Sequence, residues 1–162
     1  MKNRIVLFPG SFNPFHVGHL NILEKAEAIF GKGNVVICIG INPEKIFSPN
    51  FDEYNKKLDE IQARVQELKE KTGRPVEFYK GFLHDFITDY EKRDYDVIVV
   101  RGLRNGDDLN YEMNQLAFIQ DFKKDVKTIF IACDKELAHI SSSAIRMIKQ
   151  FGGDESTKQY II

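Results

Sequence analysis

Two histidines with a spacing suited to phosphate chemistry, His16 and His19, stand near the start of the chain in a stretch rich in glycine and proline. The apolar run 4–8 before them predicts a buried strand, and the apolar spacing over 20–30 after them predicts a helix. A turn from a strand into a helix N-terminus binds anions, because free N–H groups and the helix dipole point outward. Imidazoles beside such a turn suit a phosphate whose charge grows during reaction. The alternative is a plain turn with two surface histidines.

Groups suited to binding phosphate also follow the later apolar runs. In an open parallel sheet the carboxyl ends of the strands share one edge, so groups distant in sequence meet there. The sequence therefore predicts one phosphate site assembled from several turns. Lys45 follows the run 34–41, Arg101 and Arg104 follow the run 95–100, and Ser141, Ser142 and Ser143 follow the run 128–133 beside Arg146.

The two arginines allow two interpretations. They can bind phosphate oxygens with two hydrogen bonds each. Gly102 between them would let a ligand approach the backbone closely, and Gly18 would do the same between the histidines. They can also be surface arginines paired with Asp107 or Asp108. The three serines are explained by capping of a helix alone, and phosphate binding at that helix start is the functional alternative.

Strand-like runs alternate with helical segments along the whole chain, which predicts an α/β fold with a doubly wound, five-stranded parallel sheet. Without a linker or repeat, residues 1–162 are expected to form one domain. A long amphipathic helix is expected over about 53–71, its charged residues forming a solvated face, after a loop at 46–54 with three aromatics. A further helix is expected from an N-cap at Asp107.

Composition excludes several classes of protein. The net charge of −1 over 162 residues offers no general attraction for nucleic acid or an anionic membrane, and no apolar run is long enough to span a bilayer. No signal-peptide pattern is visible, and no CxxC or HExxH spacing predicts a protein metal site. Cys38 and Cys133 lie in separate apolar runs and are expected to be buried free thiols in a reducing cytosol.

The stretch Phe8–His19 resembles the first signature of the nucleotidylyltransferase superfamily, which implies a Rossmann-like fold and transfer of a nucleotidyl group from a nucleoside triphosphate. The string Arg101–Glu112 is similar to the more specific RGLR-x3-D-x2-YE string of bacterial phosphopantetheine adenylyltransferases. The likeness continues at Gln115–Ala117 and at His139–Ser143. Matched elements thus run in order through nearly the whole chain.

This resemblance implies transfer of AMP from ATP to 4′-phosphopantetheine, giving dephospho-coenzyme A and pyrophosphate, with Mg²⁺ held mainly by the ATP phosphates. It also implies a homo-oligomer, usually a hexamer, in the cytoplasm. By resemblance, His19 stabilises the transition state, assisted by Lys45 and Arg101, and the acceptor is bound by Ser11, Lys45, Leu83 and Arg101. The residues implied for ATP are Ser11, Phe12, His16, His19, Gly102, Leu103, Arg104, Glu112, Leu137, His139, Ile140, Ser141, Ser142 and Ser143.

Some positions depart from that family. Asn13, His16 and Arg146 look more like the nicotinate mononucleotide adenylyltransferases, and the segment 46–68 lacks the usual Glu-Glu-Arg helix start. A nicotinate or nicotinamide mononucleotide adenylyltransferase is therefore the alternative enzyme. A non-catalytic nucleotide-binding regulatory protein is the alternative from another class. An acceptor phosphate is already a nucleophile, so the absence of a Ser-His-Asp arrangement agrees with nucleotidyl transfer.

Overall fold

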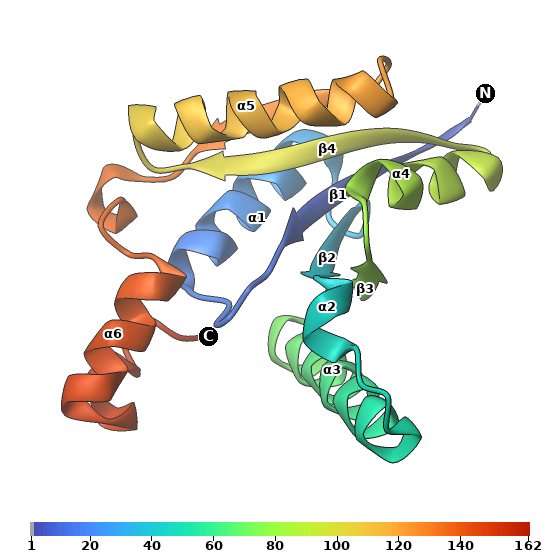
Figure 1. Cartoon of the computed structure of the whole chain (residues 1–162). Helices are drawn as coiled ribbons and strands as arrows, with labels where there is room; N and C mark the ends of the chain where they lie inside the picture. The colour runs from blue at the N-terminus through green and yellow to red at the C-terminus, as the bar shows by residue number, and fades with distance from the viewer. Residues whose placement is uncertain (1) are drawn as a thin grey trace.

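Five parallel strands form the centre of the computed structural model, which describes residues 2–162, in the order β3-β2-β1-β4-β5 (Figure 1). The chain moves outward from β1 to β3, then returns to place β4 on the other side of β1. The doubly wound α/β sheet expected from the sequence is confirmed. The strands are β1 Asn3–Gly10, β2 Val35–Ile41, β3 Val76–Lys80, β4 Tyr95–Leu103 and β5 Thr128–Ala132.

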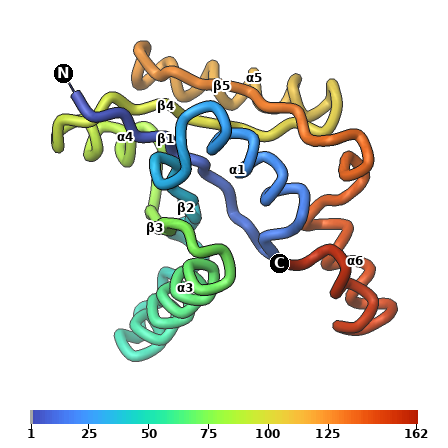
Figure 2. Tube along the Cα trace, turned by 180° about the vertical axis from the view of Figure 1, so that it is seen from behind, coloured from blue at the N-terminus to red at the C-terminus, as the bar shows by residue number. Residues whose placement is uncertain are grey.

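Helices cover both faces of this sheet, as the two opposite views show (Figures 1 and 2). Helices α1 and α3 pack on one face, and α4 packs on the other with α5 alongside β4. Within residues 2–162, no helix has both the length and the apolar character needed to cross a membrane. The helices are α1 Val17–Phe30, α2 Pro43–Ile46, α3 Phe51–Thr72, α4 Leu83–Lys92, α5 Gly106–Phe122 and α6 Ser142–Gly152, with 3-10 turns η1 Lys135–Leu137 and η2 Asp154–Thr157.

Alternating side chains of the strands build the two halves of the core. In β1, Val6 and Phe8 belong to the cluster beneath α1 and α3, whereas Leu7 belongs to the cluster beneath α4. This alternation follows from the two-residue repeat of a strand. Because both faces are covered, the central strands are apolar throughout, which is why their sequences read as continuous apolar runs.

Three boundaries differ from the expectations. Strand β4 continues to Leu103, because Arg101, Gly102 and Leu103 pair with β5, so the Arg-Gly-Leu string is strand and not turn. Helix α3 begins at Phe51, capped by the Asn50 side chain, which shortens the expected loop, and α2 occupies part of the segment before it. Helix α5 is capped by Asn105 and not by Asp107.

Two contacts hold α1 in place. Arg74, in the turn after α3, donates two hydrogen bonds to the buried carboxylate of Glu27 near the end of α1. At the other end, Ile161 forms an antiparallel bridge with His16, and the Tyr160 carbonyl accepts from the Val17 N–H at 2.9 Å. The C-terminus thus lies beside the start of α1 (Figure 1).

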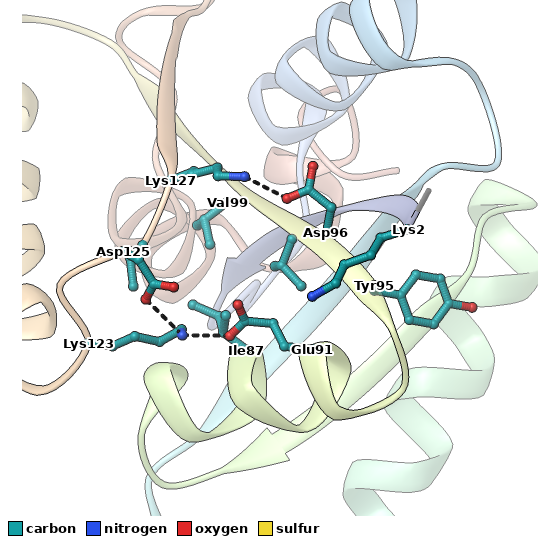
Figure 3. A pocket seen from close by; sticks show the side chains of 11 residues that line it. Lys2, Ile87, Glu91, Tyr95, Asp96, Val99, Lys123, Asp125 and Lys127 are labelled. Carbon is teal, nitrogen blue, oxygen red and sulfur yellow. Dashed lines mark hydrogen bonds and ion pairs between the residues drawn. The ribbon is translucent and has the colours of Figure 1, made fainter.

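The amino-terminal edge of the sheet carries a small cavity of about 200 Å³ whose charges neutralise one another (Figure 3). Lys123 contacts both Glu91 and Asp125, and Lys127 contacts Asp96. Lys123 and Lys127 are thus held by carboxylates at the edge of the sheet opposite to the carboxyl ends of the strands.

Candidate active site

A cleft of about 500 Å³ opens at the carboxyl edge of the sheet, beside β1 and β4, where the strand order reverses. Ligands of open α/β sheets bind at this position. The cleft brings together residues from the β1–α1 loop, β4, α5 and the start of α6. The residues singled out from the sequence that line it are Ser11, Phe12, His16, His19, Arg101, Gly102, Leu103, Arg104, Glu112, Leu137, Ile140, Ser141, Ser142, Ser143 and Arg146.

Three of the residues expected to bind ATP or the acceptor are not among those lining the cleft. His139 is exposed in the loop before α6, although Leu137 and Ile140 on either side of it in the sequence both line the cleft. Lys45 is exposed on the short helix α2, which follows β2. Leu83 begins α4 and lines a second cavity.

The second cavity, about 200 Å³, lies between the sheet and helices α4 and α5. Leu83, Leu116 and Phe130 give it apolar walls, and Gln115 and Thr128 add polar groups. Arg101 and Glu112 line both this cavity and the cleft, so their ion pair stands where the two spaces meet.

Both histidines cap the first turn of α1 with their Nδ1 atoms. The Nδ1 of His16 accepts from the Gly18 N–H at 3.0 Å, and the Nδ1 of His19 accepts from the His16 N–H at 3.1 Å. The two rings stack with centroids 3.7 Å apart. An imidazole whose Nδ1 accepts a hydrogen bond carries its proton on Nε2 when neutral. Each ring therefore offers an Nε2–H donor.

The same environment keeps both rings neutral. Burial, followed by the charge of Arg104, lowers the pKa of His16 from 6.5 to about 4. Burial also lowers the pKa of His19 well below its ordinary value, with further contributions from His16 and from the arginines 101 and 104. Near pH 7 the cleft thus presents two neutral donors, which suits a reaction that creates negative charge.

Two glycines have roles other than those expected. A Cβ on Gly18 would lie 2.9 Å from Cε1 of His16, so this glycine makes room for the imidazole that caps the helix. A Cβ on Gly102 would lie 2.8 Å from Cγ1 of Ile22, so this glycine lets α1 pack closely on β4. Both positions are explained by packing within the protein before any ligand is considered.

The arginines are paired with carboxylates. Arg104 makes two side-chain bonds of 2.9 Å to Asp108, which is one of the two partners considered from the sequence. Arg101 makes two bonds of 2.8 Å to Glu112 and also donates to the Pro9 carbonyl. The partner of Arg101 was not foreseen, although Arg101 and Glu112 belong to the same sequence string. Half-exposed Arg104 can exchange its partner for a phosphate more readily than the more deeply buried Arg101.

The start of α6 forms another wall of the cleft. Ser141 is the N-cap and accepts from the Ala144 N–H at 3.1 Å, as expected. Ser142 donates to the Pro14 carbonyl, and Arg146 donates to the Asn13 carbonyl, so α6 is tied to the loop before α1. The other N–H groups at this helix start have no intrahelical acceptor and lie at the positive end of the helix dipole, which is an arrangement that favours anions.

Several residues of the cleft were not foreseen as ligand contacts. Asp108 and Tyr111 come from α5, and Ile22 comes from α1. Cys133 also lines the cleft and is only partly buried, whereas Cys38 is buried; both are free thiols. Only Tyr111 and Asp108 carried a sequence signal, because they lie inside the Arg101–Glu112 string.

Comparison with known proteins agrees with this geometry. The cytidylyltransferase-like family model matches residues 7–148. A phosphopantetheine adenylyltransferase of Crocosphaera subtropica is 36% identical over 152 residues, covering 94% of this chain and 89% of that protein. The enzyme of the same name from Cytophaga hutchinsonii is 35% identical over 155 residues, covering 95% of each.

Solved structures share the fold at low identity. A nicotinic acid mononucleotide adenylyltransferase of Plasmodium falciparum in complex with NaAD has a TM-score of 0.60 at 16% identity, covering 98% of this chain and 90% of that one. A putative nicotinate-nucleotide adenylyltransferase of Vibrio parahaemolyticus has a TM-score of 0.56 at 15% identity, covering 98% and 86%. These likenesses concern the fold alone.

The family match covers most of the doubly wound sheet and both histidines of the turn after its first strand, so the chain belongs to the cytidylyltransferase-like family of nucleotidyltransferases. Within that family, the relatives that match more than nine tenths of the chain are phosphopantetheine adenylyltransferases. The chain therefore belongs with them, as the Arg101–Glu112 string indicated.

The neutral histidines make stability depend on pH. Between pH 6.5 and about 4 the unfolded chain binds a proton on His16 that the folded protein does not bind. The free energy of unfolding therefore falls as the pH falls through this range, by about 3 kcal/mol for a shift of this size. Urea denaturation at pH 7.0 and pH 4.5 measures this loss of unfolding free energy. In His16→Gln the loss between the two pH values is expected to be smaller than in wild type by about 2 to 3 kcal/mol. An equal loss in wild type and variant would contradict the assignment.

Proposed function

We propose that this protein transfers the adenylyl group of ATP to 4′-phosphopantetheine, releasing pyrophosphate and forming dephospho-coenzyme A. The observation that carries the proposal is the pair of neutral Nε2–H donors, fixed by capping, in a cleft that also holds a helix N-terminus. Membership of the phosphopantetheine adenylyltransferases supports the choice of acceptor.

The reaction joins a phosphate oxygen of the acceptor to the α-phosphorus of ATP, and the bond from that phosphorus to the bridging oxygen of pyrophosphate breaks. The leaving pyrophosphate takes the electron pair. The acceptor oxygen is already ionised, so the protein supplies alignment and charge stabilisation and no general base. The Nε2–H of His19 donates to an oxygen of the α-phosphate, where negative charge increases in the transition state.

ATP would occupy the cleft between β4 and α6. The N–H groups of Ser142 and Ser143 suit its terminal phosphates, because they lie at the positive end of a helix dipole. Half-exposed Arg104 can leave Asp108 to meet a phosphate. The remaining ATP contacts are proposed by resemblance for the other residues named above, including His139.

The acceptor would enter from the second cavity. Leu83 and Arg101 both line it, in keeping with the expectation that both bind 4′-phosphopantetheine. The mixed apolar and polar lining suits a pantetheine chain, which has both methyl and amide groups, and Arg101 suits the phosphate at its end. Ser11 lies at the rim of the cleft, and Lys45, on the helix after β2, is proposed to reach the same phosphate with its long side chain.

Magnesium is proposed to arrive with ATP. The carboxylates nearest the proposed phosphates, Asp108 and Glu112, are each held by an arginine, and no cluster of three or more metal-ligating side chains exists among residues 2–162. This donor set fits an ion held by triphosphate oxygens and water. When bound, the ion offsets phosphate charge.

A homo-oligomer, a hexamer by resemblance, is also proposed, in the cytoplasm. Helix α5 exposes several large apolar side chains, and two of them, Phe118 and Phe122, are more than 60% exposed. Large apolar side chains that stand exposed together on one helix are stabilised when they are covered, and a second copy of the chain would cover them.

The acceptor is tested by measuring pyrophosphate release. With ATP and Mg²⁺, we expect turnover with 4′-phosphopantetheine, little turnover with nicotinate mononucleotide, and loss of activity when a chelator removes Mg²⁺. Preference for the nicotinate would reject the proposed acceptor. ATP-induced thermal stabilisation without pyrophosphate release from any acceptor would favour a non-catalytic nucleotide-binding protein.

The role of His19 is tested by His19→Ala. Loss of a donor that acts mainly in the transition state is expected to lower kcat by roughly 100- to 1,000-fold. The affinity for ATP, measured by calorimetry, should change far less. Similar losses in kcat and in ATP affinity would make His19 a binding residue only.

The assembly is tested by light scattering after gel filtration. Wild type is expected at six times its 18.7 kDa mass. The double variant Phe118→Asp/Phe122→Asp should dissociate, whereas the control Phe151→Asp, at an 88% exposed site on α6, should not. A monomeric wild type, or an intact double variant, would reject α5 as the interface.

A further inference from the structure

The loop between β1 and α1 offers four successive carbonyl oxygens to side chains of other helices. Nη2 of Arg64, on α3, donates to the carbonyls of Ser11 and Phe12 at 2.9 and 3.3 Å. Arg146 and Ser142, both of α6, donate to the next two carbonyls along the loop. The loop is therefore held from two sides, by α3 and by α6.

Arg64 differs from the α6 residues in where it lies. Arg146 and Ser142 line the cleft themselves, whereas Arg64 lines a separate cavity of about 300 Å³ behind the loop, together with Phe12 and Ile162. The guanidinium of Arg64 thus contacts the loop from the side away from the cleft, and any effect on the reaction passes through the backbone.

The peptide geometry shows what this contact does. The bond between Ser11 and Phe12 is trans, so the Ser11 carbonyl and the Phe12 N–H point in opposite directions. Holding the carbonyl toward Arg64 turns the N–H toward the cleft, which Ser11 and Phe12 both line. Within residues 2–162 the Phe12 N–H has no protein acceptor. A cation on the carbonyl also makes the N–H a stronger donor, because hydrogen bonds in series polarise one another.

The conformation of Phe12 needs such support. Its φ of 47° lies in the left-handed region, which a bulky residue adopts only when its surroundings enforce it. This turn places the buried ring of Phe12 edge-on against the imidazole of His19, at a centroid distance of 4.9 Å. The backbone at Phe12 therefore sets the position of one amide and one imidazole at the same time.

We infer that Arg64 is a positioning residue for the reaction: through the Ser11 and Phe12 carbonyls it directs the Phe12 N–H and the His19 ring at the reacting phosphate. This inference rests on the proposed function, and it adds a residue that the sequence analysis did not single out. It predicts that loss of Arg64 lowers the rate of the chemical step more than it lowers stability or ATP affinity.

The kinetic test compares Arg64→Ala with Lys69→Ala, an exposed position on the same helix. Arg64→Ala is expected to lower kcat roughly 10- to 100-fold, the scale of a small misplacement of reacting groups. The KM for ATP and the unfolding midpoint should change little, and Lys69→Ala should match wild type. Arg64→Lys, or guanidinium ion added to Arg64→Ala, should restore part of kcat. An unchanged kcat, or a loss that neither rescue recovers, would overturn the inference.

A second measurement keeps this inference separate from the proposed function. In ligand-free protein with isotope-labelled phenylalanine, the Phe12 amide resonance is assigned by its disappearance in Phe12→Leu. Arg64→Ala should shift that resonance, while Lys69→Ala leaves it unchanged. An unmoved resonance would overturn the role of Arg64 even if wild type turns over phosphopantetheine. Wild type inactive with every acceptor would instead reject the proposed function, whatever the resonance does.

Discussion

The first turn of α1 imposes the constraint on which the site depends. Its orphan N–H groups are capped by the Nδ1 atoms of His16 and His19, so a structural need of the helix decides which nitrogen of each ring carries the proton. A serine or aspartate would cap this helix as well. Neither could present a neutral ring N–H to the cleft at the same time. Helix stability and the chemistry of the site therefore require the same hydrogen bonds.

Close packing around this turn explains how the constraint is maintained. Gly18 makes room for the His16 ring, Gly102 lets α1 approach β4, and Phe12 lies against His19. The C-terminal residues add a main-chain bond to Val17. Each contact fixes the position or the burial of an imidazole, and burial is the first cause of the lowered pKa values of both histidines. The donors stay neutral because the turn is tightly packed.

The sequence predicts the fold and most of the cleft, because both follow from local patterns. Apolar runs define the parallel strands, and the topology then brings the residues after β1, β4 and β5 to one edge. What it could not predict depends on contacts between distant segments. The pairing of Arg101 with β5 makes it a strand residue, and Arg64 of α3 reaches back to Ser11. In the sequence alone, Arg101 looks the same as an arginine in a turn, and Arg64 looks the same as an arginine on a solvated helix face.

The paired arginines explain how a protein with a net charge of −1 can be suited to a polyanionic ligand. A free guanidinium in the cleft would have to be ordered when the nucleotide binds, at a cost in side-chain entropy. Asp108 and Glu112 already hold Arg104 and Arg101 in bidentate geometry, so much of that ordering is complete before binding. A phosphate that displaces one of these carboxylates therefore binds an arginine side chain that is already ordered. Because Arg104 is the more exposed of the two arginines, its ion pair with Asp108 costs less to open. The ion pair of Arg101 with Glu112 is also tied to the Pro9 carbonyl, and it keeps the junction between the cleft and the second cavity rigid.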